Sequence, residues 1–379
     1  MEIDFARSPR STVGVEWELM LLDRATGELS SSGPDVLQRL DDAGATVGIT
    51  GELLTNTIEV MSDPHEHVAD VIGDIRRRIA TVREQLDPDV TLATAGSHPY
   101  AQWYDQSVTD RSRYQKLIER TQWWGRNMMI WGSHVHIGID DRAKVFPIIG
   151  ELLTYLPHLL ALSTSSPFWA GERTGYASNR SLVFQQLPTA GVPWTLPDWA
   201  SFERYLDDMV GTGIMDDVTE VRWDIRPAPR WGTVEIRVCD AVATTLELGA
   251  IAAFTQCLVE WASRRLDDGE RLTMLAPWFW RENKWRAARY GLDTAVIVSP
   301  DGTQVPVRDD IERLLETLAP IARDLGCIEE LADVRVILDG GPGWRRQVEV
   351  ATAADGDLDA VVAHLIEEFD SGVPRTASA

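Results

Sequence analysis

Alternating polar and apolar positions near the N-terminus predict a strand with an unusual polar face. Over residues 12–23, the odd-numbered positions from Val13 to Leu19 are apolar, whereas Glu16 and Glu18 share the opposite face. Two carboxylates placed in this way lie about 7 Å apart and repel each other by about 2 kcal/mol at an effective dielectric constant of about 20. We therefore expect a cationic group beside this strand.

Three later stretches, residues 51–61, 131–139 and 232–240, also combine apolar residues of strand character with ionisable side chains. With the first strand, these stretches supply Glu16, Glu18, Glu52, Glu59, His134, His136, Glu235 and Arg237. One such pair alone is more typical of a solvated sheet face, but solvated faces also carry lysine, and the three lysines of the chain lie outside these stretches. If the strands are neighbours, one sheet face is apolar and the other is lined with ligands for hard divalent cations.

Apolar residues at helical spacing predict helices at 33–44, 64–86, 113–118, 143–163, 245–266, 277–292, 308–325, 328–337 and 355–369. Asp63 and Pro64 have the residue types of a helix N-cap and first turn, and helix 64–86 is expected to cover the apolar face of the sheet. Further strands are predicted at 91–96 and 220–227, the latter forming a hairpin with 232–240. Residues 188–197 are long enough to form a lid.

No repeat or compositional break divides the chain, so a single catalytic domain is predicted for residues 1–370, followed by a flexible tail at 371–379. Hydrophobic residues make up 44% and charged residues 25% of the 379 positions, as in ordinary globular enzymes. The formal net charge of −23 argues against a general nucleic-acid binder, which needs a basic surface.

Membrane residence and secretion are not indicated either. The most apolar helical run, residues 145–162, is interrupted by Pro147 and Glu151 and is predicted to be a buried core helix. The three cysteines are widely spaced without a Cys-x-x-Cys motif, so neither a disulfide framework nor a zinc knuckle is expected. The N-terminus lacks the basic and apolar segments of a signal peptide, and a cytoplasmic location is predicted.

The candidate chemistry follows from the polar face. The chain has no P-loop, no Gly-x-Ser-x-Gly elbow and no Gly-x-Gly-x-x-Gly motif. Several acids, an imidazole and an arginine on one sheet face instead suit two or three Mg²⁺ ions, or Mn²⁺, that bridge polyphosphate oxygens. Arg237 would then oppose the charge that develops on a transferred phosphoryl group. ATP-dependent chemistry is the leading hypothesis.

Seven segments resemble the glutamate-cysteine ligase type 2 family, the ATP-dependent carboxylate-amine ligases. They are residues 13–18, 52–64, 96–99, 134–136, 223–227, 232–240 and 282–292. The segments keep the family order and span nearly the whole chain, so together they are specific. Trp17 departs from the family pattern, in which an acidic or polar residue is common, but it points away from the predicted ligands.

The resemblance implies an α+β fold of the glutamine-synthetase type, in which a curved, mainly antiparallel sheet forms a funnel-shaped active site with helices packed outside. It implies a ligase that uses ATP to join the γ-carboxylate of L-glutamate to the α-amine of L-cysteine through γ-glutamyl phosphate, giving γ-glutamylcysteine, ADP and phosphate for thiol biosynthesis. The expected partners are therefore small molecules, and a homo-oligomer remains open.

The resemblance also assigns roles to residues. The implied metal ligands are Glu16, Glu18, Glu52, Glu59, His136 and Glu235, with His134 beside them. Arg237 is implied to contact the transferred phosphate and to bind ATP with the help of Arg226. For the amino-acid substrate we expect Arg113 with Tyr114, and Arg180, because a guanidinium group matches a carboxylate.

Three alternatives stay open from the sequence. The ligase could use a different amine, because the amine pocket is not readable from these residues. A metal-dependent amidohydrolase also begins with His-x-His on a strand, although it needs further ligating histidines. A metal or nucleotide sensor without catalysis is the third alternative.

Overall fold

The computed structural model describes residues 2–375. Its centre is a sheet in which β2 (Ile49–Gly51), β3 (Thr57–Met61), β1 (Val13–Asp23), β5 (Ser133–Gly138), β9 (Thr233–Ile236) and β8 (Ile225–Ala228) follow one another in space. Each neighbouring pair is antiparallel. β4 (Val90–Ala93) pairs with the C-terminal part of β1. The four stretches with ionisable side chains are thus brought into one sheet, as the sequence predicted.

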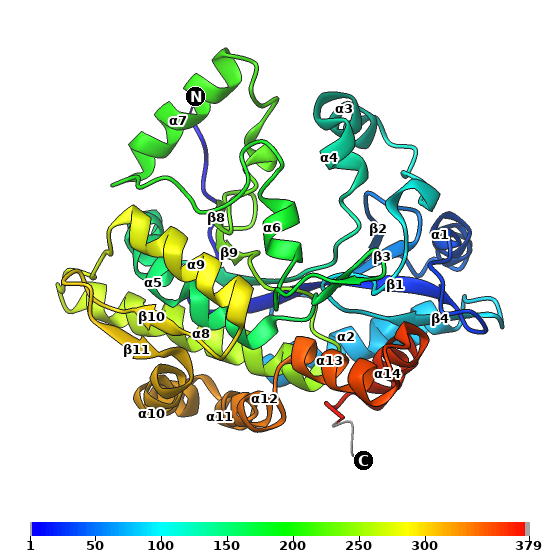
Figure 1. Cartoon of the computed structure of the whole chain (residues 1–379). Coiled ribbons are helices and arrows are strands. Elements are labelled where there is room, and N and C mark those ends of the chain that lie inside the picture. Colours follow the sequence, from blue (N-terminus) through cyan, green and yellow to red (C-terminus); the bar gives the residue numbers. More distant parts are fainter. Residues whose placement is uncertain (1, 376–379) are drawn as a thin grey trace.

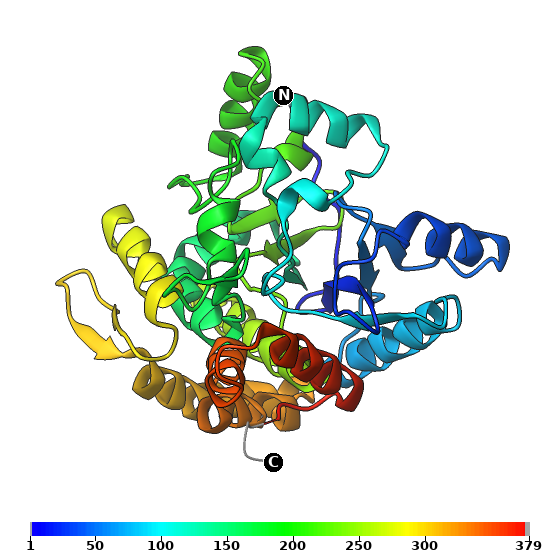
Figure 2. The same ribbon diagram turned by 45° about the vertical axis from the view of Figure 1, so that its right-hand side comes forward.

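Helices cover one side of this sheet and rise as two arms on the other (Figure 1). The covering layer contains α2 (Val68–Arg83), α5 (Val145–Ser163) and α8 (Thr245–Asp267). The first arm carries α3 (Ser112–Thr121) and α4 (Trp123–Arg126), and the second carries α6 (Arg180–Phe184) and α7 (Trp199–Gly211). Figure 2 shows the same arrangement turned by 45°, with α9 (Pro277–Tyr290) at one edge and the C-terminal helices at the base.

The remaining helices are α1 (Gly33–Asp42), α10 (Val307–Leu325), α11 (Ile328–Ala332), α12 (Val334–Gly340), α13 (Gly343–Ala353) and α14 (Leu358–Ser371). Short 3₁₀ turns occur at Trp103–Asp105, Arg142–Lys144 and Val218–Glu220. Two hairpins lie outside the main sheet, β6 (Phe168–Trp169) with β7 (Glu172–Arg173) and β10 (Ala295–Ile297) with β11 (Gln304–Pro306).

The hydrophobic core lies between the apolar sheet face and the covering helices. Helix α8 is buried along most of its length and packs against α2, α5, α10 and α11. Trp17 is fully buried on this side of β1, and its indole N–H donates to the carbonyl oxygen of Val242 at 3.1 Å. Its large apolar surface therefore stabilises the sheet, while the neighbouring glutamates point the other way.

One helix of the described residues, Arg142–Ser163, is long and apolar enough to span a membrane, but 94% of its most apolar window is buried. It is a core helix, as predicted. The main cluster of buried apolar residues extends from Val13 to Phe369, which supports our proposal of one domain over residues 1–370. Helix α14 reaches Ser371, while residues 376–379 of the predicted flexible tail lie outside the described residues.

Several features of the secondary structure differ from the sequence prediction. The predicted helix 328–337 is divided into α11 and α12 at Asp333, and the predicted strand 220–227 is regular only from Ile225. Helix α2 begins at Val68 and not at Pro64, and Asp63 does not cap it. Residues before the helix stay extended because Val13 and His65 exchange two backbone hydrogen bonds, at 2.8 and 2.9 Å. Tertiary pairing with β1 thus overrides a good local helix start. Helices α7 and α13 were not predicted, although Asp198 caps α7 by accepting from the Ser201 N–H at 2.8 Å.

Candidate active site

The register of the sheet aligns the predicted polar residues in rows. Glu18 lies opposite Glu59 on β3, and Glu16 lies opposite His134 on β5. His136 lies opposite Glu235 on β9, which in turn lies opposite Arg226 on β8. Directly opposed residues of antiparallel strands point to the same face. All these side chains therefore project from the sheet face that the covering helices leave open.

Glu16 stands at the centre of two possible metal-binding triads. One triad joins Glu16, Glu59 and His134, and the other joins Glu16, His136 and Glu235; within each, the ligand atoms lie within 4.8 Å of one another. Glu16 Oε2 is 3.1 Å from His134 Nδ1, and its Oε1 is 3.2 Å from His136 Nε2. Burial opposes ionisation of Glu16, but the hydrogen bonds to both histidines outweigh it and hold its pKa well below the usual range.

Two arginines surround Glu235 at one end of this face. Arg226 Nε lies 2.6 Å from Glu235 Oε2, and Arg237 donates to Glu235 Oε1. Burial favours the neutral form of Glu235, but the charges of Arg226 and Arg237 outweigh it and lower its pKa. The charge of Glu235 is thus matched within the protein, which sets it apart from the other glutamates of the face.

The opposite end of the face holds carboxylates whose pKa values are raised, although Arg113 lies 3.9 Å from Glu52. Burial, together with repulsion from Glu52, raises the pKa of Glu18 to about 7. Burial and repulsion from Glu16, Glu52 and Glu18 raise the pKa of Glu59 well above its ordinary value. Burial also raises the pKa of Glu52. A bound cation would offset the repulsion between these groups.

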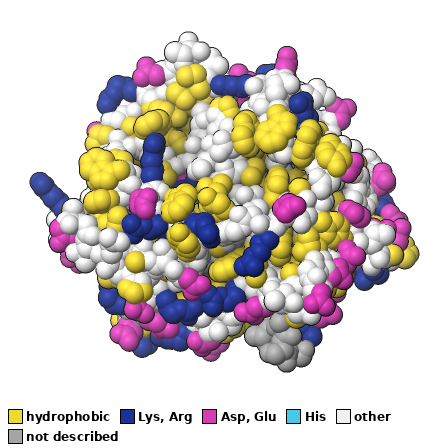
Figure 3. All heavy atoms as spheres, in the orientation of Figure 1, with side chains coloured by type: hydrophobic (Ala, Val, Ile, Leu, Met, Phe, Trp, Pro, Cys, Tyr) yellow, Lys and Arg dark blue, Asp and Glu magenta, His cyan; other side chains and the backbone are white. Residues whose placement is uncertain are grey.

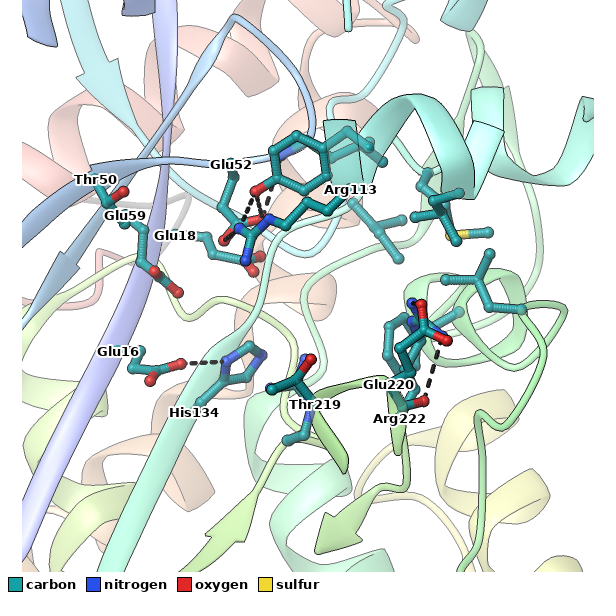
Figure 4. Close-up of a pocket in the computed structure, with 18 of the residues that line it drawn as sticks. Glu16, Glu18, Thr50, Glu52, Glu59, Arg113, His134, Thr219, Glu220 and Arg222 are labelled. Carbon is teal, nitrogen blue, oxygen red and sulfur yellow. Dashed lines mark hydrogen bonds and ion pairs between the residues drawn. The ribbon is translucent and has the colours of Figure 1, made fainter. Parts of the chain in front are cut away.

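Most of the polar side chains of this sheet face line a cavity of about 480 Å³. Figure 4 shows Glu18, Glu52 and Glu59 converging on one side, with Glu16 and His134 beneath them. Arg226 and Arg237 also line the cavity, whereas His136 and Glu235 do not. A volume of this size is typical of small-molecule sites.

The predicted substrate residues lie on the same cavity. Arg113 donates to the Tyr114 hydroxyl, which lies 3.2 Å from Glu52 Oε2. Arg180 is 3% exposed, and its Nε has no hydrogen-bond partner among the described residues. Gly132 makes room for this side chain, because a Cβ there would lie 2.2 Å from Arg180 Nη2 and 2.8 Å from His134 Nε2.

The cavity contains further residues that the sequence analysis did not single out. The polar ones are Thr50, Arg111, Thr219, Glu220 and Arg222, and the apolar ones are Leu53, Leu117, Met128, Ile130, Phe184 and Leu187. Arg222 Nη2 lies 3.7 Å from Glu220 Oε1 on the side facing the carboxylates (Figure 4). Glu220, Arg222 and Arg226 are separated by even numbers of positions, and this spacing was a signal in the sequence that they could share one face. Most of the additional cavity residues come from irregular segments, where spacing gives no such signal.

The donor set fits divalent cations. His134 Nε2 is buried without a hydrogen-bond partner among the described residues. Burial and the charge of Arg237 lower the pKa of His134 to about 4, so the ring is neutral near pH 7, as a metal ligand must be. Several glutamate oxygens with one or two imidazole nitrogens suit Mg²⁺ or Mn²⁺ better than a thiolate-preferring metal.

The other histidines do not join this site. His65 binds Asp74, and His67 binds the Leu325 carbonyl oxygen. His98 binds the Gly27 carbonyl oxygen, and His158 pairs with Asp310 in the core. His364 lies 3.4 Å from Glu368 in the helical layer. Within residues 2–375, the additional ligating histidines of an amidohydrolase are therefore not assembled.

Comparisons with known sequences agree with this site. A family model described as glutamate-cysteine ligase family 2 matches residues 12–364. A protein of Leifsonia xyli subsp. xyli is 56% identical over 374 residues, covering 98% of this chain and 99% of its own. One of Clavibacter michiganensis subsp. michiganensis is 52% identical over 377 residues, covering 99% and 98%. Both bear the name "Putative glutamate--cysteine ligase 2".

Two solved structures share the fold at low sequence identity. Glutamate-cysteine ligase from Francisella tularensis in complex with AMP matches with a TM-score of 0.66 and 16% identity, over 98% of this chain and 94% of that one. A bifunctional glutathione synthetase from Pasteurella multocida matches with a TM-score of 0.68 and 13% identity, over 95% and 52%. The predicted α+β fold class is thereby confirmed. From the family model and the full-length relatives, this chain belongs to glutamate-cysteine ligase family 2 and is an ATP-dependent carbon-nitrogen ligase.

Proposed function

We propose that the enzyme joins the γ-carboxylate of L-glutamate to the α-amine of L-cysteine at the expense of ATP. The observation that carries this proposal is the sheet face with buried carboxylates at one end and Arg226 and Arg237 at the other. Such a face suits an anionic acceptor and a polyphosphate donor bound side by side. The products are γ-glutamylcysteine, ADP and phosphate.

The first chemical step activates the carboxylate. An oxygen of the γ-carboxylate attacks the γ-phosphorus of ATP, and the bond to the β,γ-bridging oxygen breaks to release ADP. Arg237 is proposed to oppose charge on the transferred phosphoryl group. Arg226, which like Arg237 donates to Glu235, is proposed to assist Arg237. Arg113 with Tyr114, and Arg180, are proposed to bind and orient the carboxylates of the amino-acid substrate.

The second step forms the amide bond. The amine nitrogen attacks the acyl carbon of γ-glutamyl phosphate, the bond between that carbon and the phosphate oxygen breaks, and the amine loses a proton. Phosphate is a far better leaving group than the oxide of a free carboxylate. We nominate no protein residue as the general base, because oxygens of the departing phosphate can accept the proton.

Metal ions are proposed to bind along the polar face of the sheet. Glu16, Glu59 and His134 form one set of ligands, Glu16, His136 and Glu235 form a second, and Glu18 and Glu52 complete the face. Two or three Mg²⁺ ions, or Mn²⁺, would supply positive charge that offsets repulsion between the polyphosphate and the substrate carboxylate. The raised pKa values of the buried Glu18, Glu52 and Glu59 are the feature of this chain that supports such binding.

We also propose a cytoplasmic location and small molecules as the only substrates. The free, buried state of Cys239, Cys257 and Cys327 is compatible with a reducing compartment. The acidic net charge of −23 supports the absence of nucleic-acid binding.

The experiment measures phosphate release from ATP with Mg²⁺ and L-glutamate, first with L-cysteine and then with a panel of other amines. We expect release that cysteine stimulates, with γ-glutamylcysteine in the mass spectrum. Glutamate-dependent release that only another amine stimulates would replace cysteine in the proposal. No ATP turnover with any amine would overturn the proposed reaction. The same assay is applied to Glu16→Gln, which removes a proposed metal ligand. Its matched control is Glu84→Gln, because Glu84 is exposed and lies far from the sheet face.

A further inference from the structure

A second cavity of about 480 Å³ lies beside the active site, and none of its lining residues has a role in the reaction proposed above. Its walls come from the segment 189–194, from α7 and from α9, with Trp223 among them. Helix α6 separates the two cavities: it contributes Arg180 and Phe184 to the active site, while Leu182 faces the second cavity. The two cavities share no lining residue.

Indole rings form much of the wall of this second cavity. Trp223 is 2% exposed, whereas Trp194 and Trp285 are 59% and 41% exposed. Tyr205 adds a fourth aromatic ring, whose centroid lies 5.1 Å from that of Trp223. Figure 3 shows hydrophobic and basic side chains mingled on this face of the molecule, over the region of α9. Aromatic rings in such a wall favour a planar, aromatic ligand by stacking.

The charge of the second cavity is opposite to that of the whole protein. Its lining includes Arg281 and Lys284 but no aspartate or glutamate, although the chain has 59 acidic and 36 basic residues. Lys284 Nζ lies 2.9 and 2.8 Å from the two carboxylate oxygens of Asp224, so its charge is matched. Arg281 is exposed and has no hydrogen bond or ion pair within residues 2–375. One unmatched cation therefore remains for a ligand.

We propose that this second cavity binds a planar aromatic anion, stacked on Trp285 and Trp194 and paired with Arg281. A guanidinium group is planar and binds carboxylate or phosphate oxygens through two parallel hydrogen bonds, so it recognises either kind of anion. Two kinds of molecule have this chemistry. One is a nucleotide, with its base and phosphate, and the other is an aromatic carboxylate. The cavity volume suits a molecule of either kind.

The second cavity is connected to Arg237, which directly follows β9. The Asp224 carbonyl oxygen accepts from the Arg237 N–H at 2.8 Å, and the Asp224 N–H donates to the Gly191 carbonyl oxygen at 2.8 Å. Lys284 and Gly191 both line the cavity, so Asp224 links two of its walls to β9. A ligand in the second cavity would contact Lys284 or Gly191, each of which is hydrogen-bonded to Asp224, and Asp224 is in turn hydrogen-bonded to Arg237.

The test is calorimetric titration of the full chain, without Mg²⁺, with AMP and separately with indole-3-acetate. We expect at least one probe to bind with a Kd below about 1 mM, and its uncharged counterpart, adenosine or 3-methylindole, to bind at least tenfold more weakly. Arg281→Gln and Trp285→Ala should each weaken binding at least tenfold. Arg286→Gln, on the same helix but bonded to Glu282 and Gln304 outside the cavity, is the matched control and should bind as the wild type does.

Variants of the two cavities distinguish the outcomes. If Arg222→Gln abolishes AMP binding and Arg281→Gln does not, AMP binds in the active site. The inference is then decided by whether indole-3-acetate binds and whether Arg281→Gln weakens that binding. Binding of neither probe, or binding that Arg281→Gln and Trp285→Ala leave unchanged, overturns the inference even if the ligase reaction is observed. A tenfold higher KM for ATP in Arg281→Gln would identify the ligand as the substrate nucleotide, and an unchanged KM would identify a separate ligand.

Discussion

The protein contains two buried clusters of arginine and glutamate. They differ in whether every charged group finds a partner within the protein. In the helical layer, Arg346 donates to Glu368 at 2.6 Å, to Glu247 at 2.8 Å and to the Gly341 carbonyl oxygen at 2.6 Å. Glu247 also accepts from the Thr244 hydroxyl at 2.8 Å. Arg346, Glu247 and Glu368 are at most 1% exposed, and every nitrogen of the guanidinium group has a partner. This cluster is complete without a ligand.

The cluster on the sheet face is incomplete. Arg226 and Arg237 satisfy Glu235, but Arg237 Nε is buried without a partner among the described residues. On the same face, Glu18 and Glu59 have raised pKa values because they are buried near other carboxylates. A buried cluster that satisfies itself holds helices together, whereas one with unmatched charge of both signs is suited to bind ions and substrates. Four predictions test this difference, beginning with the largest expected effect.

Glu16→Gln should remove nearly all ligase activity and leave the protein folded. Glu16 is common to both triads, so its loss should lower kcat/KM by about 10³- to 10⁴-fold, or about 4 to 5.5 kcal/mol. Phosphate release measures the activity, and circular dichroism checks the fold. Glu84→Gln should behave as the wild type. Turnover close to that of the wild type in Glu16→Gln would contradict the metal-binding role of the sheet face.

Arg346→Met should have its effect on stability and not on catalysis. It leaves Glu247 and Glu368 buried without their cation, so the free energy of unfolding should fall by about 3 to 5 kcal/mol. Urea titration measures this loss, while turnover per folded molecule should stay unchanged. The neighbouring Arg345→Met is the control, because its partly exposed ion pair with Asp293 contributes at most about 1 kcal/mol. Equal destabilisation by both substitutions would remove the contrast between the clusters.

Arg237→Ala should depress kcat by about 10²-fold and change the KM for ATP little. The reason is that Arg237 is proposed to act on charge that appears only as the phosphoryl group is transferred. Steady-state kinetics with saturating glutamate separate the two parameters. A change confined to KM would instead mean that Arg237 binds ATP equally well before and during the reaction.

Glu18→Gln should stabilise the metal-free protein at neutral pH, on the order of 1 kcal/mol. The pKa of Glu18 is about 7 in the folded protein against an ordinary value of 4.5, so the folded state holds the proton more tightly. Wild-type stability is therefore lost as pH rises from about 4.5 to about 7. Urea titrations in EDTA at about pH 5 and pH 8 should show a gain from Glu18→Gln only at the higher pH. An equal gain at both values would mean that ionisation of the buried Glu18 carboxyl is not the cause.

The polar face of the sheet was readable from the sequence because strand alternation is a local property of the backbone. Glu16 and Glu18, like His134 and His136, share a face in any extended strand. The resemblance implied one curved, mainly antiparallel sheet, and the structure then gave the order of its strands and the register that aligns these residues in rows. Local patterns were less reliable at the start of α2, where Asp63 and Pro64 favour a helix but pairing with Val13 keeps the chain extended.

The sequence by itself determined the residue types of the site and which of them share a strand face. Only the tertiary structure decided which charges are matched, because that depends on neighbours distant in the chain. Glu235 is paired with Arg226 and Arg237, whereas Glu18 on β1, Glu59 on β3 and Glu52 in the loop after β2 repel one another. The second cavity was equally unreadable, since its indoles and Arg281 come from three separate segments that meet only when the chain folds.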